Sequence, residues 1–381
     1  MFATPLAWSH SGGWKRQTVA RPNIDLVLYF GTRASLADGD RYAELRAMFP
    51  TACLMGCTTG GQIHGDELDD ELNAIALGFD ATKIRATSVE INSAADSRRC
   101  GEEIGRNLAS PDLAGVFVLS DGLNVNGSEL VAGTTAHVGG VPITGGLAGD
   151  GAQFVKTLVG IDNPPRSRMI AAIGFYGKAV KIGHGSAGGW DVFGPKRRIT
   201  RAKGNILLEL DGGPALDLYA RYLGEDEIEA LPGSALLFPL QINDPKRPDH
   251  RIMRSVLAVD RNTKSMTFAG DMPEGWVAQL MKGSFDRLAL GAADAAQQAR
   301  DGLDNCRDNS GVAILVSCIG RRILMGQRAL DEIEAAGEAL GPKLRRLGFY
   351  SYGEISPHAV SGICELHNQT MTVTTITEVV A

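Results

Sequence analysis

Cysteine is scarce in this chain. There are six cysteines in 381 residues, and no two of them form a C-x-x-C pair. Several lie within apolar runs, where a reduced and buried thiol is the ordinary state. The sequence therefore gives no support to a zinc or redox motif, and it predicts no metal ligand.

Long apolar runs and an excess of one charge sign are missing as well. The longest uncharged runs, such as "GVAILVSCIG", suit buried strands and are too short to span a bilayer. Pro5 interrupts the apolar stretch at the N-terminus, so no signal peptide is predicted. The net charge of −6 mixes both signs and leaves no basic stripe. We expect a cytoplasmic protein whose partner is a small molecule or another protein, not nucleic acid and not a membrane.

The common sequence-local enzyme signatures are absent too. The chain has no G-x-x-x-x-G-K-[ST], H-E-x-x-H or G-x-S-x-G motif and no calcium loop. "GHGSAG" at 183–188 matches G-x-G-x-x-G after an expected strand. A dinucleotide site needs a helix there to receive the pyrophosphate, but Trp190 to Pro195 and the strand-like segment "RRITRA" follow instead. We therefore reject this site.

What the sequence does contain is one module that occurs three times: strand, helix, strand, glycine-bearing turn, strand. Its copies run from "IDLVLYFG" to "LNAIALGF", from "LAGVFVLSDG" to "FVKTLVGI", and from "GVAILVSCIG" to "QTMTVTTITE". The third copy predicts a single helix over 321–341. The repeat predicts an α/β fold of mixed sheets packed together and flanked by helices, in two related halves. A charged, proline-containing stretch near 226–233 divides the chain into 24–225 and 234–378.

Two further elements are well marked. Ser284 is a good N-cap for a helix whose apolar stripe consists of Phe285, Leu288, Ala292, Ala296 and Ala299. The segment 252–270 reads as a hairpin that turns at 260–262.

The three glycine-bearing turns recur at one place in the module: "GCTTGG" at 56–61, "GGLAGDG" at 145–151 and "GE" at 353–354. Glycine there permits close approach of the backbone to a ligand or to a neighbouring strand. The alternative is that each turn is only a tight connection. If the turns share a cleft, the ligand-binding candidates on and beside them are Thr58, Gly60, Gly61, Gly146, Gly149, Asp150, Tyr352 and Gly353.

The segment "GFYSYGEISPHAVSGICELHNQT" at 348–370 concentrates polar side chains between two apolar runs. Glu354 follows a glycine at the end of an apolar strand, and His367, Asn368 and Thr370 offer the donors and acceptors that hold a polar small molecule. Their alternative is to satisfy loose backbone groups at a strand entry. An enzyme is the rival hypothesis, in which Glu354 and His367 act together with Asp150 or Cys57 from other modules. Glu365 is the alternative second carboxylate, and His358 is the alternative base.

Several long motifs resemble the FIST family, which carries paired N-terminal and C-terminal regions. They are "RNLAS…VFVLSDGL…GGLAGDG", "ITRAKGNILLELDGGPALDLYARYLG", "SCIGRR" and "GFYSYGEISP…CELHNQTMTVTTI", and the likeness extends from about Ile24 to Thr377. The resemblance implies a sensory module of signal transduction that binds a small ligand such as an amino acid. It also implies a separate output protein, a histidine kinase or a cyclic-dinucleotide enzyme.

Some relatives in this family are haem proteins that sense nitric oxide, so the resemblance raises haem as an alternative ligand. His184 is the candidate axial ligand, because it ends an apolar strand and is followed by small residues, then Trp190 and Phe193. Its alternative is a structural histidine bonded to backbone. His10 and His250 lie in polar stretches and are expected to be exposed.

Overall fold

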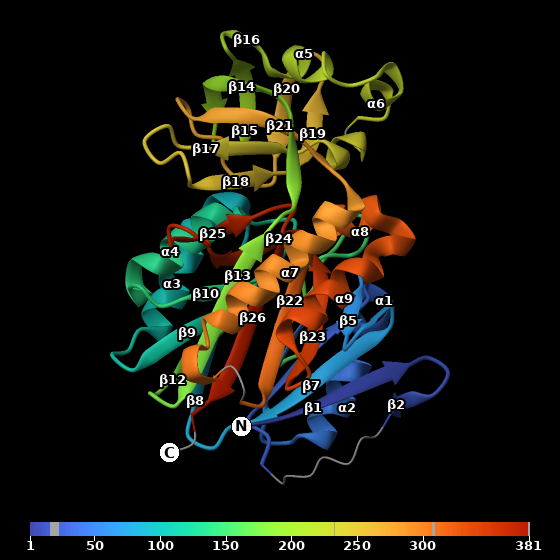
Figure 1. Ribbon diagram of the computed structural model, residues 1–381. Coiled ribbons are helices and arrows are strands. Elements are labelled where there is room, and N and C mark those ends of the chain that lie inside the picture. Colours follow the sequence, from blue (N-terminus) through green and yellow to red (C-terminus); the bar gives the residue numbers. More distant parts are fainter. Residues whose placement is uncertain (16–22, 232, 307–308, 380–381) are drawn as a thin grey trace.

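The computed structural model describes residues 1–15, 23–231, 233–306 and 309–379. They form a larger lower body and a smaller upper body (Figure 1). The chain passes upward from β13 (Val180–Ala187) to β14 (Trp190–Lys203), and it returns from β21 (Val277–Gly283) to α7 (Phe285–Asp301). Both bodies are therefore joined by two connections.

Three sheets of the lower body share one plan. Each contains, in spatial order, a strand, a second strand parallel to it, a third strand antiparallel to the second, and a fourth strand antiparallel to the third. The fourth strand comes from an earlier part of the chain than the other three. In that order the strands of the first sheet are β4 (Cys53–Thr58), β3 (Leu26–Gly31), β7 (Leu72–Gly78) and β1 (Phe2–Ser9). Those of the second are β10 (Ile143–Leu147), β9 (Leu113–Ser120), β12 (Met169–Tyr176) and β8 (Lys83–Glu90). Those of the third are β23 (Leu344–Ser351), β22 (Gly311–Cys318), β26 (Met371–Glu378) and β13.

Each module also sends a strand into a neighbouring sheet, and the exchange runs in a circle. The strand that follows the turn of the first module pairs with β23, that of the second pairs with β4, and that of the third pairs with β10. These exchanged strands are β5 (Gln62–His64), β11 (Val159–Ile161) and β24 (Gly353–Pro357); the outer strands β6 (Glu67–Asp69), β25 (Cys364–His367) and β2 (Gly13–Lys15) extend the edges. Each of the three sheets therefore contains at least one strand that belongs to another module.

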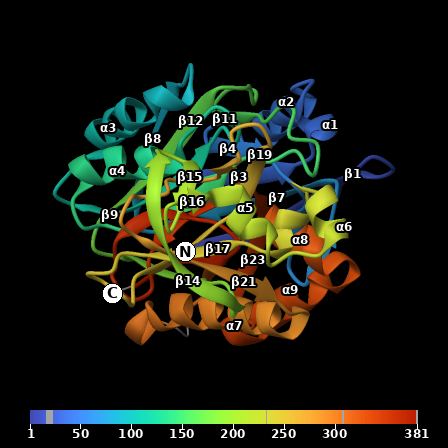
Figure 2. The ribbon, with the colours of Figure 1, turned by 90° about the horizontal axis from the view of Figure 1, so that it is seen from above.

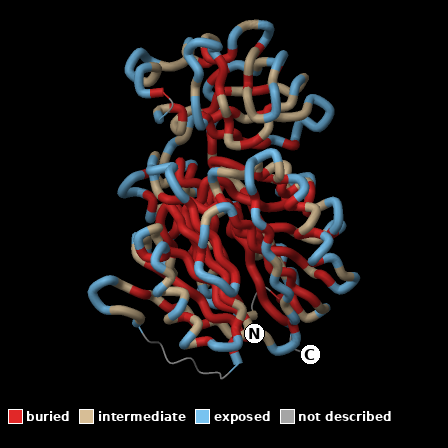
Figure 3. Tube along the Cα trace, turned by 180° about the vertical axis from the view of Figure 1, so that it is seen from behind, coloured by how far each residue is buried: buried red, intermediate tan, exposed pale blue. Residues whose placement is uncertain are grey.

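The inner faces of the three sheets meet in one core, and helices cover the outer faces. On β3, Leu26, Leu28 and Phe30 face the shared core while Val27 and Tyr29 face outward, as the two-residue period of a strand requires. Figure 3 shows the buried trace concentrated in these strands. Seen from above, the helices lie on three sides of the lower body (Figure 2). They are α1 (Arg33–Leu36) and α2 (Asp40–Met48), α3 (Ser97–Leu108) and α4 (Gly127–Val138), and α7 with α8 (Ile319–Met325) and α9 (Ala329–Leu340).

The structure confirms the α/β class with mixed sheets flanked by helices, and it confirms the helix after Ser284, whose predicted stripe is buried except for the half-buried Phe285. The single helix over 321–341 is wrong, because Gly326 takes a φ of 55° and separates α8 from α9. The third strand of the second module is also wrong. The predicted strand covers 154–161, but the amides of Phe154, Val155 and Lys156 bind Asp150, and only the short strand β11 forms in this segment. The place beside β9 in the sheet is taken by β12.

The upper body is a β-sheet unit with its own apolar core. Its strand order is β18 (Arg251–Arg254), β17 (Leu240–Asn243), β21, β14, β15 (Ile206–Leu210), β20 (Ser265–Phe268) and β19 (Val256–Asp260), with β16 (Gly213–Pro214) beside β15. Strands β19 and β20 form the hairpin predicted within 252–270. The helices α5 (Ala215–Ala220) and α6 (Glu225–Glu229) pack on this unit. Among the described residues, no helix combines the length and apolar character needed to cross a membrane.

Candidate functional site

The glycine-bearing turns of the three modules meet at the ends of the parallel strands. The Gly60 amide donates to the Tyr350 carbonyl at 2.8 Å, and the Tyr350 amide donates to the Gly61 carbonyl at 2.9 Å. The Gly149 amide donates to the Thr58 carbonyl at 3.0 Å. Backbone hydrogen bonds therefore tie the first module to both of the others.

The third module closes the contact back to the second. The Tyr352 amide donates to the Leu147 carbonyl at 3.2 Å, and the Tyr352 hydroxyl donates to the Asp150 carboxylate. Gly353 is paired with Leu147 in the β10–β24 register, and Gly146 lies one residue further along. The structure thus brings all eight candidates of the turns into one region.

Gly61 marks the tightest part of this region. Its φ is 134°, and a Cβ placed there would overlap the guanidinium of Arg322. That guanidinium donates to the Gly60 carbonyl and to Asp70, with Nη1 2.8 Å from the carboxylate. A side chain at position 61 would therefore displace Arg322 as well as strain the backbone.

Asp150 holds the loop that follows β10. Its carboxylate accepts from the amides of 154–156 at 2.8–3.0 Å, from the Tyr352 hydroxyl, and from Arg33 Nη1 at 3.5 Å. Burial alone would raise the pKa of this carboxyl, but the hydrogen bonds outweigh it and the pKa is lowered. Asp150 is therefore ionised and fully engaged with protein donors.

A polar cleft opens beside these turns, with a volume of about 830 Å³. Its lining carries both charge signs, which suits a small ligand that has an anionic and a cationic group. The lining residues that carry a permanent charge are Arg33, Asp70, Asp150, Lys156 and Arg322, and the others are His10, Thr32, Ala34, Ala37, Thr59, Gly60, Gly151 and Gln153.

An apolar cavity of about 420 Å³ lies between the two bodies. Leu147, Ile319 and Tyr352 line it from the lower body, and Leu236 and Phe268 line it from the upper body. Among the described residues that line it, none is charged and none is a histidine, and the polar side chains include Asn126, Asn205 and Ser255.

Tyr352 lies at the boundary between the two spaces. Its ring stacks on Phe154 with centroids 4.5 Å apart, and both rings line the apolar cavity. Its hydroxyl reaches Asp150, which lines the polar cleft. A change in one space can therefore reach the other through a single side chain.

Glu354 is fully buried and lines neither space. Its carboxyl accepts from Ser351 Oγ at 2.7 Å and from Thr370 Oγ1 at 3.0 Å. Burial raises the pKa of Glu354 to about 8, against the lowering effect of these hydrogen bonds. The side chain is therefore mostly protonated at neutral pH.

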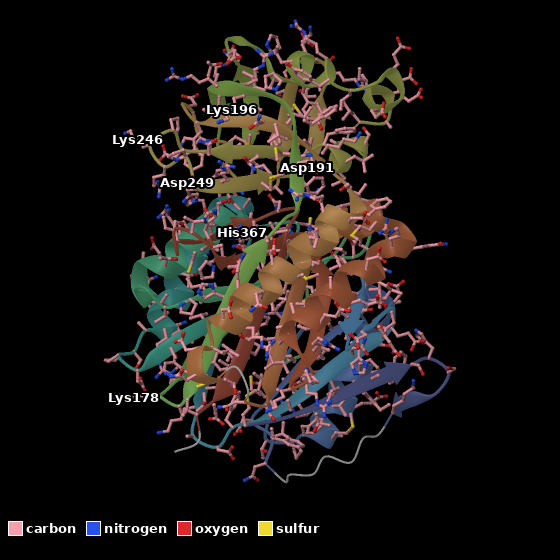
Figure 4. The ribbon with its side chains drawn as sticks, viewed as in Figure 1. Lys178, Asp191, Lys196, Lys246, Asp249 and His367 are labelled. Carbon is pink, nitrogen blue, oxygen red and sulfur yellow. The ribbon has the colours of Figure 1, made fainter. Side chains whose placement is uncertain are left out.

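The remaining candidates of the C-terminal segment do not line the polar cleft. Figure 4 shows His367 at the top of the lower body, beneath the upper body. With Thr370 it lines a small cavity of about 170 Å³, and its Nε2 lies 3.0 Å from the Ser356 carbonyl. Asn368 is fully buried, and neither of its side-chain polar atoms has a partner among the described residues.

His184, the candidate haem ligand, lies on β13. Gly183 and Gly185 face α7, so His184 points to the opposite face of the sheet. Burial lowers the pKa of its imidazole. It lines neither the apolar cavity nor the polar cleft.

The residues of the enzyme hypothesis bind separate partners. Glu354 and His367 are opposite each other in the β24–β25 register, yet Glu354 bonds to Ser351 and Thr370 while His367 faces a backbone carbonyl. The Cys57 thiol is fully buried, and burial raises its pKa well above the ordinary value.

Sequence reasoning identified Asp150 but missed the other charged residues of the polar cleft, which are Arg33, Asp70, Lys156 and Arg322. Arg33 follows the first strand of the first module, and Arg322 follows the first strand of the third, within the quoted motif "SCIGRR". The common signal was their position directly after a buried strand, where ligands are often held in α/β proteins.

Together these features define an α/β protein of repeated strand–helix–strand units, with two cavities where the parallel strands end. Residues 25–213 match the FIST N domain, and residues 215–357 match the FIST C domain. The chain therefore belongs to the FIST family, whose domains are sensory domains. The resemblance carried by the sequence motifs is confirmed.

An uncharacterized protein of Methanocaldococcus jannaschii is similar to this chain. The two are 24% identical over 307 residues, which cover 74% of this chain. The matched part is 57% of that protein's own length, so this chain spans little more than half of the relative.

Proposed function

We propose that this protein is a cytoplasmic sensor that binds a small amino-acid-like metabolite in the polar cleft. The observation that carries the proposal is the arrangement of charge around the convergent turns: Arg33, Lys156 and Arg322 can receive a carboxylate, and Asp70 can receive an ammonium group. The six unpaired cysteines agree with a reducing compartment.

The cleft is also well placed to pass on a signal. Arg33 belongs to the first module, Asp150 to the second and Tyr352 to the third, and they form one hydrogen-bonded chain. A ligand that attracts Arg33 away from Asp150 alters this chain and, through the Tyr352 ring, the cavity below the upper body. We propose that a histidine kinase or a cyclic-dinucleotide enzyme reads this change.

A thermal-shift screen of amino acids and related metabolites tests the proposal. A ligand that binds only the folded state raises the unfolding temperature, and the rise grows with the logarithm of its concentration relative to its dissociation constant. Each hit is then incubated with the protein and recovered after denaturation. A sensor returns the molecule unchanged, whereas chemical turnover would support the rival enzyme hypothesis built on Glu354 and His367.

A further inference from the structure

Three potential metal ligands from the two bodies meet at their interface. His250 immediately precedes β18 in the upper body, and His358 and Glu365 belong to the β24–β25 hairpin of the lower body. One ligand atom from each lies within 4.8 Å of the other two. The expectation that His250 is exposed is wrong: it is only 4% exposed, because the hairpin packs against the segment that carries it.

The group has unused bonding capacity in a buried place. His250 Nε2 lies 3.0 Å from Glu365 Oε2. Among the described residues, His250 Nδ1 and Glu365 Oε1 are buried and have no partner. Buried polar atoms are usually satisfied, so these two atoms indicate a missing binding partner.

The third residue is fixed in the tautomer that a metal ligand needs. His358 Nδ1 accepts from the amides of Val360 and Ser361 at 3.3 Å, so its proton is on Nε2, which donates to the Arg251 carbonyl at 3.1 Å. Histidines that bind metals commonly donate the other ring N–H to a backbone carbonyl in this way. The lone pair of Nδ1 is therefore the one that His358 can offer, and an ion bound there replaces the two long amide contacts that Nδ1 now accepts.

We propose that His250, His358 and Glu365 bind a divalent transition metal ion, and that the ion joins the upper body to the lower body. Two imidazoles and one carboxylate form a donor set that suits zinc and neighbouring first-row metals, and three protein ligands leave a position open for water or a further ligand. The site is separate from the polar cleft and needs no ligand there.

Binding would change the interface. The rings of His250 and His358 are now parallel, with centroids 4.5 Å apart and an interplanar angle of 9°. A metal ion lies in the plane of each imidazole ring that binds it. Because the two rings are parallel, one of them must rotate out of the stack before both can bind the same ion. The buried Arg254 guanidinium attracts the same Glu365 carboxylate, so we expect weaker binding than in closed structural zinc sites.

The experiment is a calorimetric titration of the chelator-treated full chain with zinc, repeated on His250→Gln and Glu365→Gln. His137→Gln, which alters an exposed histidine on α4, is the matched control. We expect one equivalent of zinc to bind the wild type and the control, and each ligand substitution to lower the affinity by at least about tenfold. Zinc should also raise the unfolding temperature of the wild type and the control, but not of the two variants.

Two results would overturn the proposal: less than one equivalent bound by the wild type, or unchanged affinity in both ligand variants. Metal-free unfolding curves show whether each variant is folded. If His250→Gln is not, Glu365→Gln decides the outcome, because its amide keeps the volume of the carboxyl and removes its charge.

Discussion

The hydroxyl of Tyr352 donates a hydrogen bond to the carboxylate of Asp150, although 202 positions separate them in the sequence. The bond joins the turn of the third module to the turn of the second. Because Asp150 also contacts Arg33, this one pair connects the polar cleft with the interface between the bodies.

The substitution Tyr352→Phe tests this relationship. It leaves one buried acceptor position of Asp150 without its donor, so we expect the free energy of unfolding to fall by about 1–3 kcal/mol. Tyr176→Phe is the control, since its hydroxyl also donates to a buried acceptor, the Leu108 carbonyl, but far from the cleft. Denaturant unfolding should show a loss in both, whereas only Tyr352→Phe should reduce the thermal shift caused by a cleft ligand. An equal ligand response in both variants would contradict the coupling.

The buried Glu354 gives a pH dependence whose sign follows from its raised pKa. With a pKa of about 8 in the folded state and an ordinary value near 4.5 in the unfolded state, the folded protein holds the proton between these values and the unfolded chain does not. Stability from this group therefore falls as the pH rises from 4.5 to 8, by about 3 kcal/mol at pH 7. Glu354→Gln should remove that slope.

Unfolding free energies measured across this pH range check the prediction, with Glu334→Gln, an exposed change on α9, as the control. A slope that survives Glu354→Gln would show that another group causes it. Glu354→Gln and Asn368→Ala should also be titrated with a cleft ligand, because Glu354 and Asn368 remain our predicted ligand-binding residues, although neither lines the polar cleft or the apolar cavity.

Gly61 should not tolerate a side chain. Gly61→Ala places a Cβ against Arg322 at a φ of 134°, and we expect a loss of about 1–3 kcal/mol of stability. Gly139 has a positive φ of 70° but open space around it, so Gly139→Ala reports the cost of backbone strain without the clash. Equal losses in thermal unfolding would mean that the contact with Arg322 contributes nothing.

Haem binding through His184 is the alternative function, and the geometry argues against it. The apolar cavity has no histidine in its lining, and His184 lies on a sheet face outside that cavity. We expect titration with ferric haem to give no Soret band that depends on His184. A stoichiometric band that His184→Ala abolishes would instead support a nitric-oxide sensor.

The sequence predicted the modules and the candidate turns, because strand, helix and glycine patterns are local. It did not predict the circular exchange of strands, since the pairing of β5 with β23 joins residues almost 300 positions apart and leaves no local pattern. The second module misled the prediction because Asp150 binds the amides of 154–156, which then cannot form a strand. His250 looked exposed because its sequence neighbours are polar, while the hairpin that buries it comes from the other body.

Calorimetric titration of the strongest thermal-shift ligand tests the central claim, that this FIST protein senses a small charged metabolite in the polar cleft. It is carried out on the wild type, on Arg33→Gln and on Arg98→Gln, which removes a similar charge from an exposed ion pair with Glu129. Losing a charge-assisted hydrogen bond costs about 1.5–3 kcal/mol, so Arg33→Gln should weaken binding roughly tenfold to a hundredfold while Arg98→Gln binds like the wild type. Unchanged affinity in Arg33→Gln, or equal losses in the two variants, would contradict the claim.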